Sequence, residues 1–176
     1  MMKYFNKILL LTFLAVICLS CQEKPKPLPT PNQSQLKESL EKANRYLVLE
    51  EEEEIQNYVD RHEWNMVATG SGLRYEILQH GEGELIQPGQ TVVMEYVLND
   101  IQGDVVYSSE NDGLKSFVVG AGGAETGLDE AVRRMRKGTV AHVIIPSHLG
   151  YGLLGDQNSI PSYATLIYTI RIKDVR

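Results

Sequence analysis

Short apolar runs separated by turn residues fill the chain from Leu73 to its end, and this pattern restricts that region to a fold based on a β-sheet. The clearest run covers residues 164–173, where Leu166, Ile170 and Ile172 alternate with polar residues in the two-residue period of a half-buried strand. Further strands are predicted at residues 73–78, 92–98, 105–107, 117–119 and 140–146.

One short helix is predicted to interrupt these strands. Leu128, Ala131, Val132 and Met135 form an apolar stripe at helical spacing, and Gly138 follows the end of the stripe. Because the connections are all short, an antiparallel sheet curled around this helix accounts for residues 70–176. The predicted fold class is α+β.

The composition excludes several kinds of site. A net charge of −6 argues against a general nucleic-acid binder, and two cysteines cannot form a multi-bridge disulfide scaffold or a four-cysteine zinc site. The four histidines lack metal-ligand spacing, and the glycine-rich segment 120–127 has Glu125 where a dinucleotide fingerprint needs its third glycine. We therefore expect no metal and no cofactor.

Residues 1–20 have the layout of a secretory signal, in which Lys3 and Lys7 precede an apolar run at residues 8–19. This run is shorter than the roughly 20 apolar residues that span a bilayer. The sequence Leu19-Ser20-Cys21 resembles the end of a bacterial lipoprotein signal, which implies cleavage before Cys21 and attachment of lipid to its sulfur. The protein is then expected in the cell envelope, held to the membrane by lipid, at the outer membrane or the periplasmic face. The alternatives are an uncleaved anchor and an ordinary cleaved signal in which Cys21 has no role.

A proline-rich segment, residues 21–33, follows the signal. Pro25, Pro27, Pro29 and Pro31 alternate with other residues and favour an extended polyproline II conformation. The segment is interpreted as a semi-rigid tether.

Residues 34–69 are predicted to form a helical arm. Leu36, Leu40, Ala43 and Leu47 form one apolar face, and the run of glutamates at residues 50–54 follows it. The glutamates are interpreted as a solvated helix face, and a site for cations or a basic partner is the alternative. The arm could pack on the following domain or mediate self-association.

The order of motifs after residue 72 resembles the FKBP family of peptidyl-prolyl cis–trans isomerases. The resemblance covers about residues 73–176. It rests on Pro88-Gly89-Gln90, Glu95-Tyr96, Val106-Tyr107-Ser108-Ser109, Gly127-Leu128-Asp129-Glu130, Leu149-Gly150-Tyr151-Gly152, Ile160-Pro161 and Ala164-Thr165-Leu166-Ile167-Tyr168. It implies an antiparallel sheet half-wrapped around the short helix, with a shallow apolar pocket between them.

The resemblance also implies a role for individual residues. Those with an expected catalytic role are the pocket walls Tyr96 and Tyr107 and the loop residue Tyr151, whose hydroxyl would bond the substrate backbone. Those expected to bind substrate are Phe117, Glu125 through its backbone N–H, the floor residue Leu128, the wall residue Ile160, and Tyr168, which stands where Phe is usual.

Besides Tyr168, the sequence departs from the family pattern at three places in this site. Ser108 replaces an Asp that orients neighbouring groups, Lys115 replaces an aromatic wall residue, and Ala124-Glu125 replaces an apolar pair. Because apolar wall is lost, catalysis and macrolide binding are expected to be weak.

The function implied is rotation about X–Pro amides in exported proteins. The barrier to this rotation is roughly 18–20 kcal/mol, because the planar amide is stabilised by resonance. A dry apolar pocket can favour the twisted, less polar amide without any nucleophile. Proline-containing polypeptides are thus the expected partners, besides the membrane reached through the lipid.

Two other functions fit the same sequence. The domain could be a non-catalytic chaperone or assembly module that binds proline-containing segments, or a purely structural tether with its pocket blocked by its own loop. The whole layout also resembles the gliding-motility-associated prolyl isomerase lipoproteins, which implies partners in the cell envelope.

Overall fold

The computed structural model describes residues 32–176. The predicted signal, the lipid site Cys21 and nearly all of the proline-rich tether lie outside the described residues. The described residues fall into two units, which divide between Glu41 and Lys42.

In the first unit, the described residues begin helix α2 (Gln33–His62), which continues into the second unit. Leu36 and Leu40 are exposed, and Lys37 pairs with Glu41 at 3.9 Å. Among the described residues, no helix combines the length and apolar character needed to cross a membrane.

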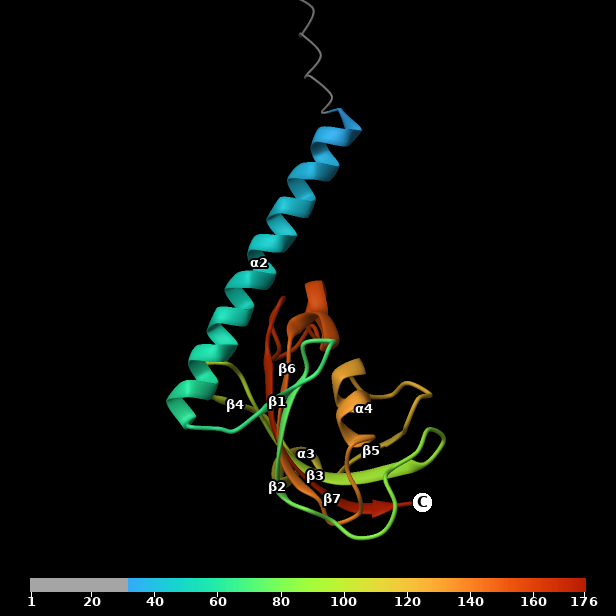
Figure 1. Cartoon of the computed structure of the whole chain (residues 1–176). Helices are drawn as coiled ribbons and strands as arrows, with labels where there is room; N and C mark the ends of the chain where they lie inside the picture. Colours follow the sequence, from blue (N-terminus) through green and yellow to red (C-terminus); the bar gives the residue numbers. More distant parts are fainter. Residues whose placement is uncertain (1–31) are drawn as a thin grey trace, which may run out of the picture. The chain divides into compact units, whose positions relative to one another are not determined.

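The second unit holds the sheet and the remaining helices (Figure 1). They are, in chain order, β1 (Val67–Ala68), β2 (Arg74–Gln79), β3 (Thr91–Asn99), β4 (Val105–Ser108), α3 (Ser109–Asp112), β5 (Lys115–Val118), α4 (Thr126–Val132), β6 (Val140–Ile145), the 3-10 turns η1 (Ser147–Leu149) and η2 (Gly152–Leu154), and β7 (Leu166–Val175).

The described strands form one seven-stranded sheet in the order β1-β2-β6-β7-β3-β4, with β5 also paired to β3. All of these pairings are antiparallel. Each predicted strand lies within two residues of its expected bounds, and the α+β class is confirmed. Strand β1 and helix α3 were not expected from the sequence.

Helix α4 is shorter than its predicted span of residues 128–135. After Val132, the N–H groups of Arg134 and Met135 bond carbonyls three residues back, at 3.0 and 2.9 Å. Such bonds tighten the last turn, so the regular helix ends there.

Helices cover both faces of the sheet, as Figure 1 shows for α4 and the C-terminal end of α2. Leu128 and Val132 of α4 share one buried cluster with Val143 and Ile145 of β6. The next residue of the strand, Ile144, belongs instead to a second cluster with Ile55, Tyr58 and Val59 of α2 and Ile167 of β7. Since successive side chains of a strand point to opposite faces, the unbroken apolar run in β6 is buried on both sides.

Glu51 of α2 binds both ends of the long loop between β6 and β7. Its carboxylate accepts the backbone N–H of Ser147 at 2.6 Å, the Ser147 hydroxyl at 3.1 Å and the Thr165 hydroxyl at 2.8 Å. Glu52, the next residue of the helix, and Gln56, one turn further on, accept hydrogen bonds from Arg74 of β2. The second half of α2 is therefore part of the domain.

Replacement of Ile55 by Ala tests this assignment. The side chain is fully buried, so Ile55→Ala is expected to lower the free energy of unfolding by about 2–4 kcal/mol, measured by urea denaturation. The control Leu40→Ala removes an exposed side chain from the same helix and is expected to change stability by less than about 0.5 kcal/mol. Equal effects of the two substitutions would contradict the assignment of the second half of α2 to the domain.

Candidate functional site

The aromatic and apolar side chains singled out in the sequence lie in one cluster. Its members are Tyr96 of β3, Tyr107 of β4, Phe117 of β5, Leu128 of α4, Tyr168 of β7, and Tyr151 and Ile160 of the loop between β6 and β7. Residues from β3 to β7 are thus brought together by the wrapping of the sheet around α4.

The cluster has a buried floor and a partly open rim. Phe117, Leu128 and Ile160 are at most 5% exposed, and Tyr168 is also buried. Tyr96, Tyr107 and Tyr151 are only half-buried, so they pack against the core and are also accessible to solvent. A polypeptide that reaches this site therefore meets the three tyrosines first.

Tyr107 ties strand β4 to the long loop. Its hydroxyl donates to Asp156 Oδ2 at 2.5 Å and accepts from Asn158 Nδ2 at 2.9 Å. The other oxygen of Asp156 accepts the N–H groups of Asn158 and Ile160, at 2.9 and 2.8 Å. These bonds hold Ile160 in place beside the strand.

The carboxylate of Glu125 is the polar centre of the site. Its side chain is only 2% exposed, at the N-terminal cap of α4. One oxygen, Oε1, accepts the hydroxyls of Tyr151 at 2.7 Å and Tyr168 at 2.9 Å. Lys115 Nζ lies 3.0 Å from each carboxylate oxygen. A buried charge needs such partners, because an unpaired carboxylate in an apolar interior is strongly disfavoured.

These contacts set the protonation states. Burial alone would raise the pKa of Glu125, but the Lys115 ammonium, the Tyr151 hydroxyl and the backbone N–H of Glu125 itself outweigh it and hold the pKa below its usual 4.5. Burial, together with the Glu125 carboxylate, raises the pKa of both Tyr151 and Tyr168. At neutral pH, therefore, Glu125 is ionised and both tyrosines keep the protons that they donate to it.

The sequence motifs indicate Glu125 for its backbone N–H and Lys115 as a lost wall residue. They do not reveal that the Glu125 carboxylate pairs with Lys115 and accepts the Tyr168 hydroxyl. The sequence does carry a sign of this contact, since Lys115, Glu125 and Tyr168 are all polar at positions where the family pattern is apolar or purely aromatic. The side chains at these three positions, which depart from the family pattern, thus form one hydrogen-bonded group.

The remaining departure, Ser108, caps a helix. Its hydroxyl accepts the N–H of Asn111 at 3.4 Å, and its own N–H donates to Asp112 Oδ2 at 3.0 Å. These bonds fix the short helix α3 after β4. The neighbouring Ser109 hydroxyl accepts the N–H of Tyr96 at 3.1 Å, so the turn also supports a wall of the site.

The described part of the chain holds no group of three or more His, Cys, Asp or Glu side chains placed to bind a metal ion. The polar groups of the site are instead paired with one another, and every buried side-chain nitrogen and oxygen among the described residues has a hydrogen-bond partner.

The chain belongs to the family of FKBP-type peptidyl-prolyl cis-trans isomerases, a class of enzymes, whose family model matches residues 82–173. This confirms the FKBP-like fold and the family named from the sequence motifs. The match includes every residue of the clustered site described above.

Several known proteins resemble this chain. FK506-binding protein 1 from Dictyostelium discoideum is 30% identical over 102 residues, which cover 57% of this chain and 95% of that protein. FkpA from Escherichia coli, an FKBP-type isomerase, is 29% identical over 108 residues, or 61% of this chain and 39% of FkpA. The match to FK506-binding protein 4 from Rhizopus delemar covers only 28% of that protein. The crystal structure of AtFKBP13 has a TM-score of 0.61 at 26% identity and covers 64% of this chain and 99% of that one.

Replacement of Lys115 by Met tests the importance of the Glu125 group. The substitution leaves a buried carboxylate without its cation, so it is expected to lower the free energy of unfolding at pH 7 by about 3 kcal/mol. The loss should shrink at pH 3, because a protonated Glu125 no longer needs the ammonium. Urea denaturation at both pH values measures this.

Two controls accompany that measurement. The double variant Lys115→Met/Glu125→Gln should recover most of the stability, since neither charge is then buried. Lys137→Met removes a lysine from an exposed pair with Asp174 and should cost clearly less. A Lys115→Met variant no less stable than Lys137→Met would contradict the role given to Lys115.

Proposed function

We propose that this protein accelerates cis–trans rotation about X–Pro peptide bonds in exported polypeptides within the cell envelope. The observation that carries the proposal is the placement of Tyr96, Tyr107 and Tyr151 around a buried apolar floor in a chain of the FKBP family. The expected substrate is a segment with an apolar residue before proline.

The chemistry needs no nucleophile. The planar X–Pro amide is stabilised by resonance, and the twisted amide at the top of the barrier has a less polar carbonyl. The buried side chains of Phe117, Leu128 and Ile160 offer little to hydrogen-bond with the planar carbonyl. A water-poor apolar surface thus favours the twisted form over the planar form, and this difference lowers the barrier.

Tyr151 is the donor proposed to hold the substrate backbone, and its bond to Glu125 carries a cost. The hydroxyl must leave a carboxylate in order to donate to a substrate carbonyl. Hydrogen bonds to charged groups contribute about 1.5–3 kcal/mol and neutral ones about 0.5–1.5 kcal/mol. The exchange therefore costs about 1 kcal/mol, or about fivefold in rate. This cost supports the expectation that catalysis is weak.

Turnover of a short apolar-Pro peptide, measured without a coupling protease, tests the proposal. Measurable turnover is expected for the full chain. Tyr151→Phe should lower kcat/KM by less than about fivefold, because the bond to substrate that it removes is largely offset by the bond to Glu125 that the hydroxyl no longer gives up. Tyr163→Phe is the matched control, because this loop tyrosine is half exposed and lies outside the clustered site. Full-strength turnover that nanomolar macrolide blocks would contradict the expected weakness.

The alternative function is a non-catalytic chaperone or assembly module that uses the same site. The bond between the Tyr151 hydroxyl and Glu125 favours it, since the donor is already occupied in the free protein. No measurable turnover, together with suppression of client aggregation that survives Tyr151→Phe, would establish this alternative over the isomerase.

The proposed location is the membrane surface, through lipid on Cys21. The apolar run ending at residue 19 and the Ser20-Cys21 pair support it, and Gln22 after the cysteine favours the outer membrane by analogy. The proline-rich segment would then hold the domain away from the lipid headgroups. The likeness of the whole layout to gliding-motility-associated lipoproteins supports clients in the same compartment.

Replacement of Cys21 by Ser tests the anchor. The full chain expressed in a bacterium with lipoprotein processing should be found in the membrane fraction and carry the added mass of lipid. Cys21→Ser should lose both, while Cys18→Ser, a matched cysteine inside the signal, should keep them. Membrane association that persists unchanged in Cys21→Ser would favour an uncleaved anchor.

A further inference from the structure

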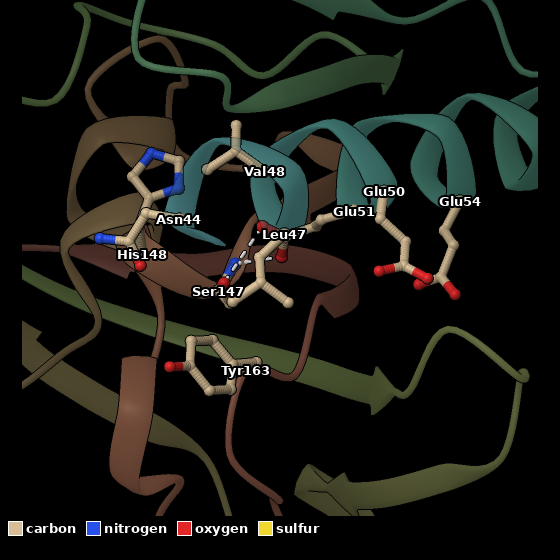
Figure 2. A pocket seen from close by; sticks show the side chains of 9 residues that line it. All are labelled: Asn44, Leu47, Val48, Glu50, Glu51, Glu54, Ser147, His148 and Tyr163. Atoms are coloured by element: carbon tan, nitrogen blue, oxygen red, sulfur yellow. Dashed lines mark hydrogen bonds between the residues drawn. The ribbon is translucent and has the colours of Figure 1, made fainter. Parts of the chain in front are cut away.

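A groove separate from the clustered site lies between α2 and the loop that joins β6 to β7 (Figure 2). Its volume is about 430 Å³, within the range of about 300–1,000 Å³ usual for binding pockets. It is lined by Asn44, Leu47, Val48, Glu50, Glu51 and Glu54 of α2 and by Ser147, His148 and Tyr163 of the loop.

The apolar lining of the groove is left in contact with solvent. Leu47, Val48 and Tyr163 are 40%, 57% and 47% exposed. Figure 2 shows the Leu47 side chain between the helix and the Tyr163 ring. None of the three belongs to either buried cluster of the described residues, so the fold itself does not use them.

The acidic side chains that line the groove, apart from Glu51, also make no contact that the fold requires. Glu51 is occupied by Ser147 and Thr165, as Figure 2 shows in part by the bonds to Ser147. Glu50 and Glu54 are exposed, and the described residues offer neither of them an ion pair or a hydrogen bond. They are four residues apart, so they lie on one helix face and repel each other until a cation is bound between them.

The lining contains no lysine or arginine. His148 Nε2 lies 2.9 Å from the carbonyl oxygen of Ser71, outside the helix. The groove thus combines an apolar wall with two uncompensated carboxylates, and its complement is a ligand that carries apolar and cationic groups together.

We propose that this groove binds polypeptide segments in which apolar residues alternate with Lys or Arg. Apolar side chains of the segment would cover Leu47, Val48 and Tyr163, and an ammonium or guanidinium group would lie between Glu50 and Glu54. The acidic lining disfavours nucleic acid and anionic lipid surfaces, because like charges repel. Parallel pairing of two copies would set Glu50 and Glu54 against their own counterparts, which disfavours a second copy as occupant.

The groove and the proposed isomerase site share one loop. His148 lines the groove, and Tyr151 follows it by three residues in the same segment. A polypeptide held by its basic, apolar part would stay beside the tyrosines of the neighbouring site. Binding in the groove does not require isomerase activity, so the two proposals can fail separately.

Fluorescence anisotropy of the full chain with a labelled peptide tests the proposal. The probe is a proline-free peptide of alternating Leu and Lys, and its matched control is the same peptide with Glu in place of Lys. The Lys peptide should bind with salt-sensitive affinity, and the Glu peptide should bind at least about tenfold more weakly, because its charges meet Glu50 and Glu54.

Variants of the groove locate the binding. Glu50→Gln/Glu54→Gln should weaken the Lys peptide about fivefold, because two exposed ion pairs of about 0.5 kcal/mol each are lost. Val48→Ser should weaken it about threefold by removing apolar surface. Glu53→Gln removes the same charge from an exposed residue outside the groove and should change affinity less than about twofold. Circular dichroism melting checks that all variants remain folded.

Three outcomes would overturn the proposal. The first is equal binding of the Lys and Glu peptides, and the second is equal weakening of binding by Glu53→Gln and by the double variant. The third is absence of peptide binding together with a concentration-dependent dimer, seen by sedimentation velocity, that Leu47→Ser abolishes. The last outcome would assign the groove to a second copy of the chain. Loss of isomerase turnover in any of these variants would concern the proposed isomerase function alone. Peptide binding in the groove would still be judged by the affinities measured here.

Discussion

The Glu125 carboxylate constrains the whole site, because a buried negative charge has to be surrounded by donors wherever the backbone places it. Here the donors come from β5, β7 and the long loop, through Lys115, Tyr168 and Tyr151. The bond to Tyr168 joins the start of α4 to the central part of the sheet. The bond to Tyr151 fixes the loop above the helix. The same contact set therefore stabilises the fold and positions the tyrosines.

This arrangement changes how a polypeptide would be recognised. In the pattern that the sequence motifs imply, the Tyr151 hydroxyl and the backbone N–H of residue 125 are directed at substrate. In this protein both groups also stabilise the Glu125 side chain. Under the proposed function, a substrate would have to compete with the Glu125 carboxylate for these donors. Apolar contact with Tyr96 and Tyr107 would then contribute more to binding than hydrogen bonding does.

The sequence predicts the features that depend on local residue pattern. It does not predict contacts that depend on how the strands are aligned with one another and with α4. Alternation located the strands, and the order of motifs located residues such as Phe117, Leu128 and Ile160. It could not show that Lys115, Glu125 and Tyr168 meet, since their contact depends on how β5 and β7 lie relative to α4. The apolar stripes of α2 have the same helical spacing at Leu36 and Leu47 as at Ile55, so the sequence could not show that only Ile55 is buried. That outcome depends on Ile144 and Ile167, which present a second apolar face of the sheet.

The attachment of α2 through Glu51 has a consequence for the order of folding. The contacts of Glu51 with Ser147 and Thr165 join residues that are 96 and 114 positions apart in the chain. The surface on which α2 docks is complete only when β7 has joined the sheet. Docking of the helix therefore comes late in folding, and it closes long loops of the domain.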